Sequence, residues 1–485
     1  MKKLPIFILI FALVATMPAC DDGFEEMNED PNNPTEVPTS YILAGAQTKL
    51  IEELFGLYNE SFKWNLTGMR YMQHWTSTLY TSEDRYVTIE GDFTPVYYKS
   101  LRDLQEVIEQ NSNPETAVQA AFSGPNQNQI AVSRILKAYT FHNLTDIWGD
   151  IPYSQTLLGS ENVTPIYDPQ EQIYEGIIQE LDEAYAQIDE GAGGIEGDLI
   201  YDGDMALWKL FAQSLRLRLG MRLSEAKPEL GQAVVADALQ KGVFTSNAQN
   251  ATFTYNEQVP FVNPWYTEFH LETITLAVSN TMIDKLMELN DPRLPAFAEE
   301  ADALGEYVGM PYGVNAAIAG SIKNEEVSLP ADAITSTDYP ATLQTYSEVL
   351  FLRAEAAARG WTGEDAEQLY EQAIAASFEQ WNVGDADLAA YLAQDEVAFD
   401  ASNYKASIGN QKWFALYMQG MEAWSEWRRL DYPQLLPAPD AAAGRDIPRR
   451  RGYPLSEISL NKKNYDEAIA RQGPDLMSTR VWWDK

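Results

Sequence analysis

The sequence contains one cysteine, Cys20, and three histidines in 485 residues. A single thiol cannot form a disulfide within the chain, and His74, His142 and His270 lack the spacing of a zinc motif. Thiol and zinc chemistry are therefore not expected. The sequence predicts neither a cofactor nor a metal site.

Basic residues are also scarce. Lys and Arg number 34 against 72 Asp and Glu, which gives a formal net charge of −38. Such a chain repels polyanions, so nucleic acid is excluded as a partner. Hydrophobic residues make up 45% of the chain, with 12 Trp, 26 Tyr and 18 Phe, which is too many for a disordered acidic protein. The sequence predicts a folded, acidic protein of one large domain or several smaller ones.

Long apolar runs are missing as well, since no segment after Cys20 has the roughly 20 uncharged apolar residues of a spanning helix. At the start, Lys2 and Lys3 precede an apolar run over residues 4–15, which predicts a signal peptide at 1–19. Cys20 follows Ala19 in a stretch that resembles a bacterial lipoprotein cleavage box. We expect this thiol to be acylated and to anchor the protein to a membrane. The alternative is an ordinary signal peptide followed by an incidental cysteine.

The lipidated N-terminal segment, residues 20–40, is acidic and rich in Pro and Asn, with neither helical nor strand periodicity. Because Pro breaks helices and like charges repel one another, we expect a tether that holds the folded body away from the lipid. The carboxylates could instead bind calcium, but a solvated linker is favoured.

Beyond residue 40, apolar residues recur at three- and four-residue steps, which predicts a predominantly α-helical fold. The run at 204–224 is apolar on two faces, as in a helix enclosed between layers, and Asp204 suits its N-cap. Its arginines, Arg216, Arg218 and Arg222, are expected to pair with carboxylates. Other helices are predicted at 41–57, 61–80, 93–110, 126–147, 169–190, 228–241, 279–289 and 409–429.

The pattern over 346–377 predicts two helices joined by a short turn. Gly360 suits the end of the first helix, and Thr362 with Asp365 resembles a capping box at the start of the second. Alanines on the facing sides permit close packing, as in tetratricopeptide-type pairs, although the regular period of about 34 residues is missing. We expect at most a few degenerate repeats.

Two long stretches, 242–278 and 296–336, lack regular periodicity. Loops of this length are usually functional or disordered. The rings of Phe253, Tyr255 and Phe261 in the first stretch indicate an ordered excursion packed on the helices, with a few short strands.

Catalytic motifs are absent from the sequence. It contains neither a G-x-S-x-G elbow nor a G-x-x-x-x-G-K-[ST] phosphate loop. A glycosidase needs a pair of carboxylates, but among 72 acidic residues such pairs arise by chance. A protein that is not an enzyme is expected, and an exported glycoside hydrolase on a helical scaffold is the alternative.

Five strings, in order, resemble core segments of the SusD/RagB family. They are LKAYTFHNLTDIWGDIPYSQTL (136–157), YDPQEQIYEGIIQELDEAY (167–185), YDGDMALWKLFAQSLRLRLGMRLS (201–224), EAWSEWRRLDYP (422–433) and the C-terminal stretch 449–485. The resemblance runs from Cys20 to the C-terminus. It implies one SusD-like domain at 41–485, in which tetratricopeptide-like helical pairs support a loop-rich ligand face.

The same resemblance implies a function. Members are lipid-anchored proteins of the outer membrane that face the cell exterior and capture an oligosaccharide or, in some cases, a peptide. They deliver it to a SusC-like TonB-dependent transporter, over which they act as a lid. The family motifs are scaffold, so they do not identify the ligand site.

The chemistry of sugar binding therefore has to predict the ligand contacts. A sugar needs an exposed ring to stack on, with polar groups around it. Two stretches supply this mixture, and they give five candidate residues: Trp75, Tyr80 and Tyr86 in the first, and Trp265 and Tyr266 in the second. Trp75 lies at helical spacing, which is also typical of a buried face, whereas Tyr80 and Tyr86 lie at or beyond the expected helix end. Two adjacent rings in a loop, as at 265–266, cannot easily both point inward.

Overall fold

The computed structural model describes residues 37–56, 63–259 and 261–485. The predicted signal peptide, Cys20 and the tether as far as residue 36 lie outside the described residues, and the folded unit is Thr39–Lys485. No helix of the described ranges is both long enough and apolar enough to cross a bilayer.

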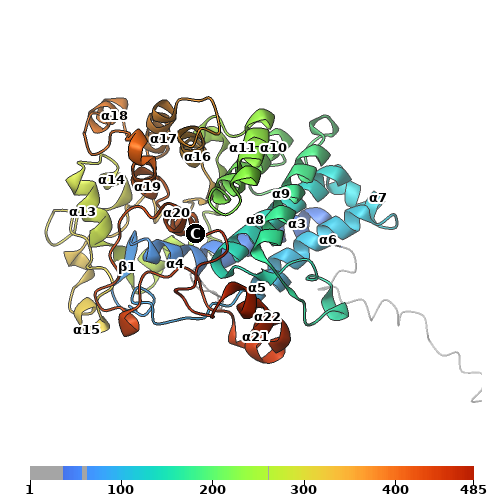
Figure 1. Cartoon of the computed structure of the whole chain (residues 1–485), viewed down its shortest axis with the longest axis horizontal. Coiled ribbons are helices and arrows are strands. Elements are labelled where there is room, and N and C mark those ends of the chain that lie inside the picture. The colour runs from blue at the N-terminus through green and yellow to red at the C-terminus, as the bar shows by residue number, and fades with distance from the viewer. Residues whose placement is uncertain (1–36, 57–62, 260) are drawn as a thin grey trace, which may run out of the picture. The chain divides into compact units, whose positions relative to one another are not determined.

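The first half of the described chain is mainly helical, as predicted (Figure 1). Its helices are α3 (Thr39–Phe55), α4 (Trp64–Tyr71), α5 (Thr94–Val96), α6 (Arg102–Ser112), α7 (Ala117–Ala120), α8 (Asn126–Trp148), α9 (Gln170–Gln187), α10 (Met205–Arg222) and α11 (Pro228–Lys241).

The second half contains shorter helices in addition to the predicted hairpin. These helices are α12 (Pro264–Tyr266), α13 (Asn280–Glu288), α14 (Leu294–Phe297), α15 (Ala316–Ala319), α16 (Tyr346–Ala358), α17 (Ala366–Gln380), α18 (Asp385–Leu392), α19 (Tyr404–Ala415), α20 (Gly420–Leu430), α21 (Leu455–Leu460) and α22 (Lys462–Gln472).

Strands are short and form three antiparallel pairs in the described residues. β1 (Trp75–Ser77) pairs with β5 (Leu276–Val278), β2 (Ile151–Pro152) with β3 (Tyr167–Asp168), and β4 (Ala251–Phe253) with β6 (Ala341–Gln344). Two of these pairs fasten the excursion at 242–278 to distant parts of the chain. The predominantly α fold with a few short strands is confirmed.

The long helices pack in pairs, α8 with α9, α10 with α11 and α16 with α17, as expected for tetratricopeptide-like hairpins. Helix α16 ends before Gly360, which has φ +73°, as the sequence predicts. The cap of α17 differs from the expectation: the side chain of Asp365, not Thr362, accepts a hydrogen bond at the helix start, from the N–H of Gln368 at 3.1 Å.

The arginines of α10 pair with carboxylates, as predicted. Arg218 lies 2.6 Å from Glu348, and Arg222 lies 2.6 Å from Glu422, with all four side chains buried. Arg216 lies 3.1 Å from Asp182. These ion pairs connect α10 to α9, α16 and α20, so the arginines belong to the scaffold and not to a ligand site.

Two predicted helices are shorter than expected. The helix expected at 61–80 ends at Tyr71, because Gln73 adopts a positive φ and the chain then enters β1. The helix expected at 409–429 is divided into α19 and α20, with Met418 at positive φ. Helix α20 packs closely on α4, since a Cβ at Gly68 would lie 2.2 Å from the carbonyl oxygen of Gly420.

Candidate ligand-binding site

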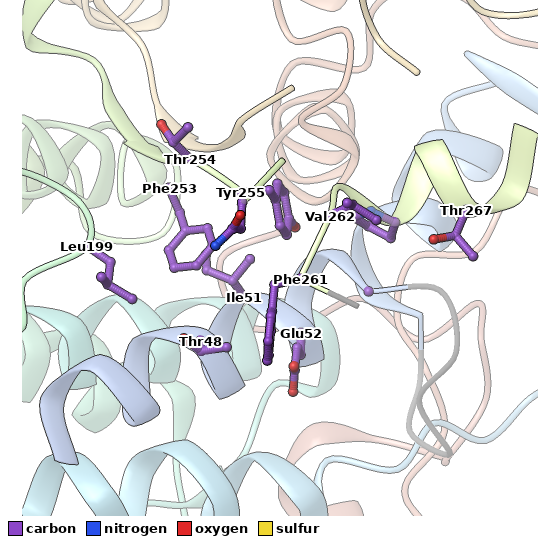
Figure 2. A pocket seen from close by; sticks show the side chains of 13 residues that line it. Thr48, Ile51, Glu52, Leu199, Phe253, Thr254, Tyr255, Phe261, Val262 and Thr267 are labelled. Atoms are coloured by element: carbon purple, nitrogen blue, oxygen red, sulfur yellow. The ribbon is translucent and has the colours of Figure 1, made fainter. Parts of the chain in front are cut away.

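A cavity of about 490 Å³ opens between helix α3 and the excursion that follows β4 (Figure 2). Its volume falls within the range of about 300–1,000 Å³ that is typical of small-molecule sites. The described lining comes from α3, from Leu199 in the loop before α10, and from the segment after β4.

Helix α3 supplies one wall of the cavity. Thr48, Ile51 and Glu52 share one face of the helix because they are three and four residues apart. The hydroxyl of Thr48 donates to the carbonyl of Ala44 at 2.9 Å. Partial burial raises the pKa of Glu52, and the nearby carboxylate of Glu53 raises it further. This wall therefore presents a hydroxyl, an aliphatic side chain and a carboxyl that is less acidic than usual.

The opposite wall carries three aromatic rings. Phe253 closes β4 opposite Ala341 of β6, and the ring of Tyr255 meets the ring of Phe253 edge-on at 5.4 Å. The N–H of Asn256 donates to the carbonyl of Phe261 at 2.9 Å, which turns the loop back on itself. Phe261 is 62% exposed, and Figure 2 shows its ring approaching the side chains of α3 from the loop side. An aromatic face is thus available to a ligand.

Asn263 holds this wall in place. Its side-chain amide donates to the carbonyls of Ile334 and Ser336 at 2.8 and 2.9 Å, and its oxygen accepts from the N–H of Trp265, which caps α12. The indole of Trp265 then packs edge-on against Trp75 at 4.7 Å. The cavity wall is therefore anchored to the protein core through Trp265.

Three of the five predicted ligand contacts are buried, and the structure reassigns them to the core. Trp75 is fully buried and donates through Nε1 to the hydroxyl of Tyr417 at 2.7 Å. Tyr86 is also fully buried, and its hydroxyl accepts from the N–H of Ala438 at 3.2 Å. Trp265 is 4% exposed. These rings fill the space between elements and have no surface left for a ligand.

The other two predicted residues reach the surface. Tyr80 is 69% exposed, and Tyr266 is half-buried with its ring 4.9 Å from the imidazole of His270. The structure does not place either residue among the described lining of the cavity. Both remain candidates for ligand contact outside it.

The residues that line the cavity are not evident from the sequence. Tyr255 and Phe261 carry a signal, since they are rings in a long excursion, but the same pattern predicts packing on the helices. Thr48 and Glu52 carry none, because a polar residue on a helix surface is ordinary. Only the packing of α3 against the excursion shows that these side chains share a cavity.

The lining offers groups that can bind a sugar. An exposed ring can stack on the C–H face of a sugar, while hydroxyl and amide groups around it pair with the sugar hydroxyls. Glycoside hydrolysis generally requires two carboxyl groups flanking the scissile bond. In the described lining, the only carboxyl group is that of Glu52.

Comparisons with known proteins show what this chain resembles. The model of a SusD-like family, described as starch-binding associating with outer membrane, matches residues 31–454. A search of curated proteins found no match.

Among solved structures, a chitin-binding protein is 28% identical with a TM-score of 0.77, covering 92% of this chain and 99% of its own. A chitin-binding SusD homolog from Flavobacterium johnsoniae is 26% identical with a TM-score of 0.76, covering 91% and 98%. A SusD homolog from Bacteroides uniformis, 24% identical with a TM-score of 0.78, covers 93% and 100% and shares the fold.

Proposed function

This chain belongs to the SusD/RagB family, and from that premise we propose that it is an outer-membrane lipoprotein that captures a nutrient glycan. The glycan occupies the cavity between α3 and the excursion after β4, with Phe261 as the stacking ring.

The cavity is the observation that carries this proposal. It combines an exposed aromatic ring with the hydroxyls of Thr48 and Thr267 and the amide of Asn256, which is the mixture that sugar recognition needs. Two solved relatives are chitin-binding proteins, which supports a glycan in preference to a peptide.

The captured glycan is delivered to a SusC-like TonB-dependent transporter, over which this protein acts as a lid. The family description, which includes association with the outer membrane, supports this assignment. Acylation of Cys20 anchors the protein on the outer face of the membrane. The tether keeps the binding body close to a transporter in the same membrane, at a high effective concentration.

A glycan array followed by calorimetry tests the binding function. We expect Phe261→Ala to weaken the binding of the selected glycan by about 1–3 kcal/mol, as for an exposed aromatic hot spot. The matched control is Phe122→Ala, because Phe122 is 75% exposed and lies outside the described lining. Equal losses in both variants, or no binding to any glycan, would contradict the proposal, and release of reducing sugar would identify a hydrolase instead.

Purification from native membranes in mild detergent tests the delivery function. We expect a large β-barrel protein to copurify in comparable amount. Recovery of this protein alone would reject the lid and leave a free-standing binding protein.

A further inference from the structure

We propose that the protein has a second binding site, which takes a small carboxylate with an apolar body. The site is a cavity of about 320 Å³ between helices α6, α8 and α9 and the loop that follows β2. It shares no described lining residue with the cavity beside α3, so it goes beyond the proposed glycan capture. Its lining residues all fall within 105–180, a stretch that the structure describes without a gap.

Three packed helices and one fixed loop form this cavity. Helix α8 packs against both α6 and α9, and all three helices contribute to the lining (Figure 1). Lys137 and Phe141 share one face of α8 because they are four residues apart. The N–H groups of Tyr153 and Ser154 donate to the carboxylate of Asp168 in β3, at 3.0 and 2.8 Å. The ring of Tyr153 then meets the ring of Phe141 edge-on at 4.9 Å.

Lys137 is the only cation in the described lining, and it forms no ion pair with a described carboxylate. Its ammonium donates to the neutral side-chain oxygen of Gln105 at 2.6 Å. Burial lowers the pKa of Lys137, and Arg134 lowers it further, although Glu180 and Glu109 act in the opposite direction from farther away. A partly desolvated ammonium whose hydrogen-bond partner is neutral would be stabilised by an anion.

The two carboxylates of the lining are each held by an arginine. Arg102 donates to both oxygens of Glu109, each at 3.0 Å. Arg134 donates to both oxygens of Glu180, at 2.8 and 3.0 Å. Because each negative charge lies against a guanidinium, these side chains repel a bound anion less than unpaired carboxylates would. The more distant charges of the protein are screened beyond about 8 Å at physiological salt.

The hydroxyl of Tyr153 is a second donor for a carboxylate. It has no hydrogen-bond partner among the described residues. Burial raises the pKa of Tyr153 to about 12, and the charges of Glu180 and Asp168 raise it further, so the hydroxyl keeps its proton at neutral pH. A Cβ at Gly176 would lie 2.7 Å from this hydroxyl, so a glycine in α9 makes room for the ring. A charged donor and a neutral donor therefore line the same cavity.

Much of the remaining lining is apolar, and it includes Ala138, Phe141, Leu157, Leu158 and Ile177. Leu157 has φ +62°, which leucine rarely adopts, so the loop places these leucines at the cavity at a conformational cost. Leu158 is 49% exposed. The aliphatic or aromatic body of a ligand would cover these side chains and bury apolar surface, whereas an inorganic anion would leave them in water.

Calorimetry of the purified protein with 4-phenylbutyrate and with its amide tests the site. The two probes have the same apolar body, and only the acid carries a charge at neutral pH. We expect the acid to bind about 10-fold more tightly than the amide at physiological salt, because only the acid places an anion against Lys137. Equal affinities of the two probes, or no binding of the acid, would overturn the inference.

Variants of the two donors locate the binding. Lys137→Met keeps the aliphatic stem and should weaken binding of the acid about 10-fold, while Tyr153→Phe should weaken it about 3-fold. The matched control is Lys463→Met in α22, which makes the same change of net charge at a side chain that is 85% exposed. Equal losses in Lys137→Met and Lys463→Met, or an unchanged affinity in Tyr153→Phe, would contradict the assignment of these donors.

Phe261→Ala separates this site from the one beside α3. We expect this variant to bind the acid as the wild type does, because Phe261 lies outside the described lining of the second cavity. A loss of affinity for the acid in Phe261→Ala would place the carboxylate in the cavity beside α3 and would overturn the inference. The glycan array tests the proposed function independently, so the two failures are distinguishable.

Discussion

The buried imidazole of His74 should make the protein less stable as the pH falls. The ring is fully buried, with its centroid 5.0 Å from the ring of Trp413 and 5.6 Å from that of Tyr417. Burial lowers the pKa of His74 to about 3, although the backbone at Trp413 raises it slightly. In the unfolded chain the pKa of histidine is about 6.5.

The sign and size of the effect follow from this difference. Because the unfolded state binds the proton at higher pH than the folded state, folding is favoured fully above about pH 6.5 and progressively less below it. Each pH unit between the two pKa values is equivalent to about 1.4 kcal/mol. His74 alone should therefore lower the free energy of unfolding by about 2 kcal/mol between pH 7 and pH 5.

The assay compares the wild type with His74→Gln by urea unfolding at pH 7.5 and pH 5.0. We expect the wild type's stability advantage over the variant to shrink by about 2 kcal/mol at the lower pH, because glutamine does not titrate. The control, His270→Gln, removes an exposed imidazole and should change the free energy of unfolding by less than about 0.5 kcal/mol at either pH. If the difference between the wild type and His74→Gln is the same at both pH values, the reasoning about burial is refuted.

Three other outcomes are expected. Trp265→Ala should lower the free energy of unfolding in urea by about 3–5 kcal/mol, because the ring of Trp265 is buried in the core. A loss below about 1 kcal/mol would show that this ring does not pack in the core. Glu426→Gln should also cost about 3–5 kcal/mol, since it leaves the buried Arg222 and Arg429 without that carboxylate, and an unchanged melting temperature would contradict this. Cys20→Ser should move the protein from the membrane to the soluble fraction, and mass spectrometry showing an unmodified mature N-terminus in the wild type would refute acylation.

Helices were predictable from the sequence wherever their determinants are local. Helix α10 is an example, because its two apolar faces and its N-cap at Asp204 are determined by residues that are close together in the sequence. The carboxylate of Asp204 accepts from the N–H of Ala206 at 2.9 Å, as expected. The arginine partners were predictable as a class because a buried guanidinium needs a carboxylate, but their identities required the fold.

The helix boundaries at Tyr71 and Ala415 were not predictable in the same way. At the first, apolar spacing continues past the helix end, but pairing of Trp75 with Val278, about 200 residues away, draws the chain into a strand. At the second, the close approach of Gly68 and Gly420 requires a turn that no local pattern shows. In both places a tertiary contact outweighs the local helical preference.

The direction of the rings at 265–266 shows why the ligand site was harder to predict than the fold. The sequence predicts that both rings lie in a loop, where two adjacent rings cannot easily both point inward. Which one turns inward depends on Asn263, whose amide is held by the carbonyls of Ile334 and Ser336, some 70 residues further along the chain. That anchor starts α12 and sends Trp265 toward Trp75, while Phe261, on the other side of the anchor, stays exposed at the cavity. The binding surface is therefore set by long-range hydrogen bonds that periodicity and composition do not encode.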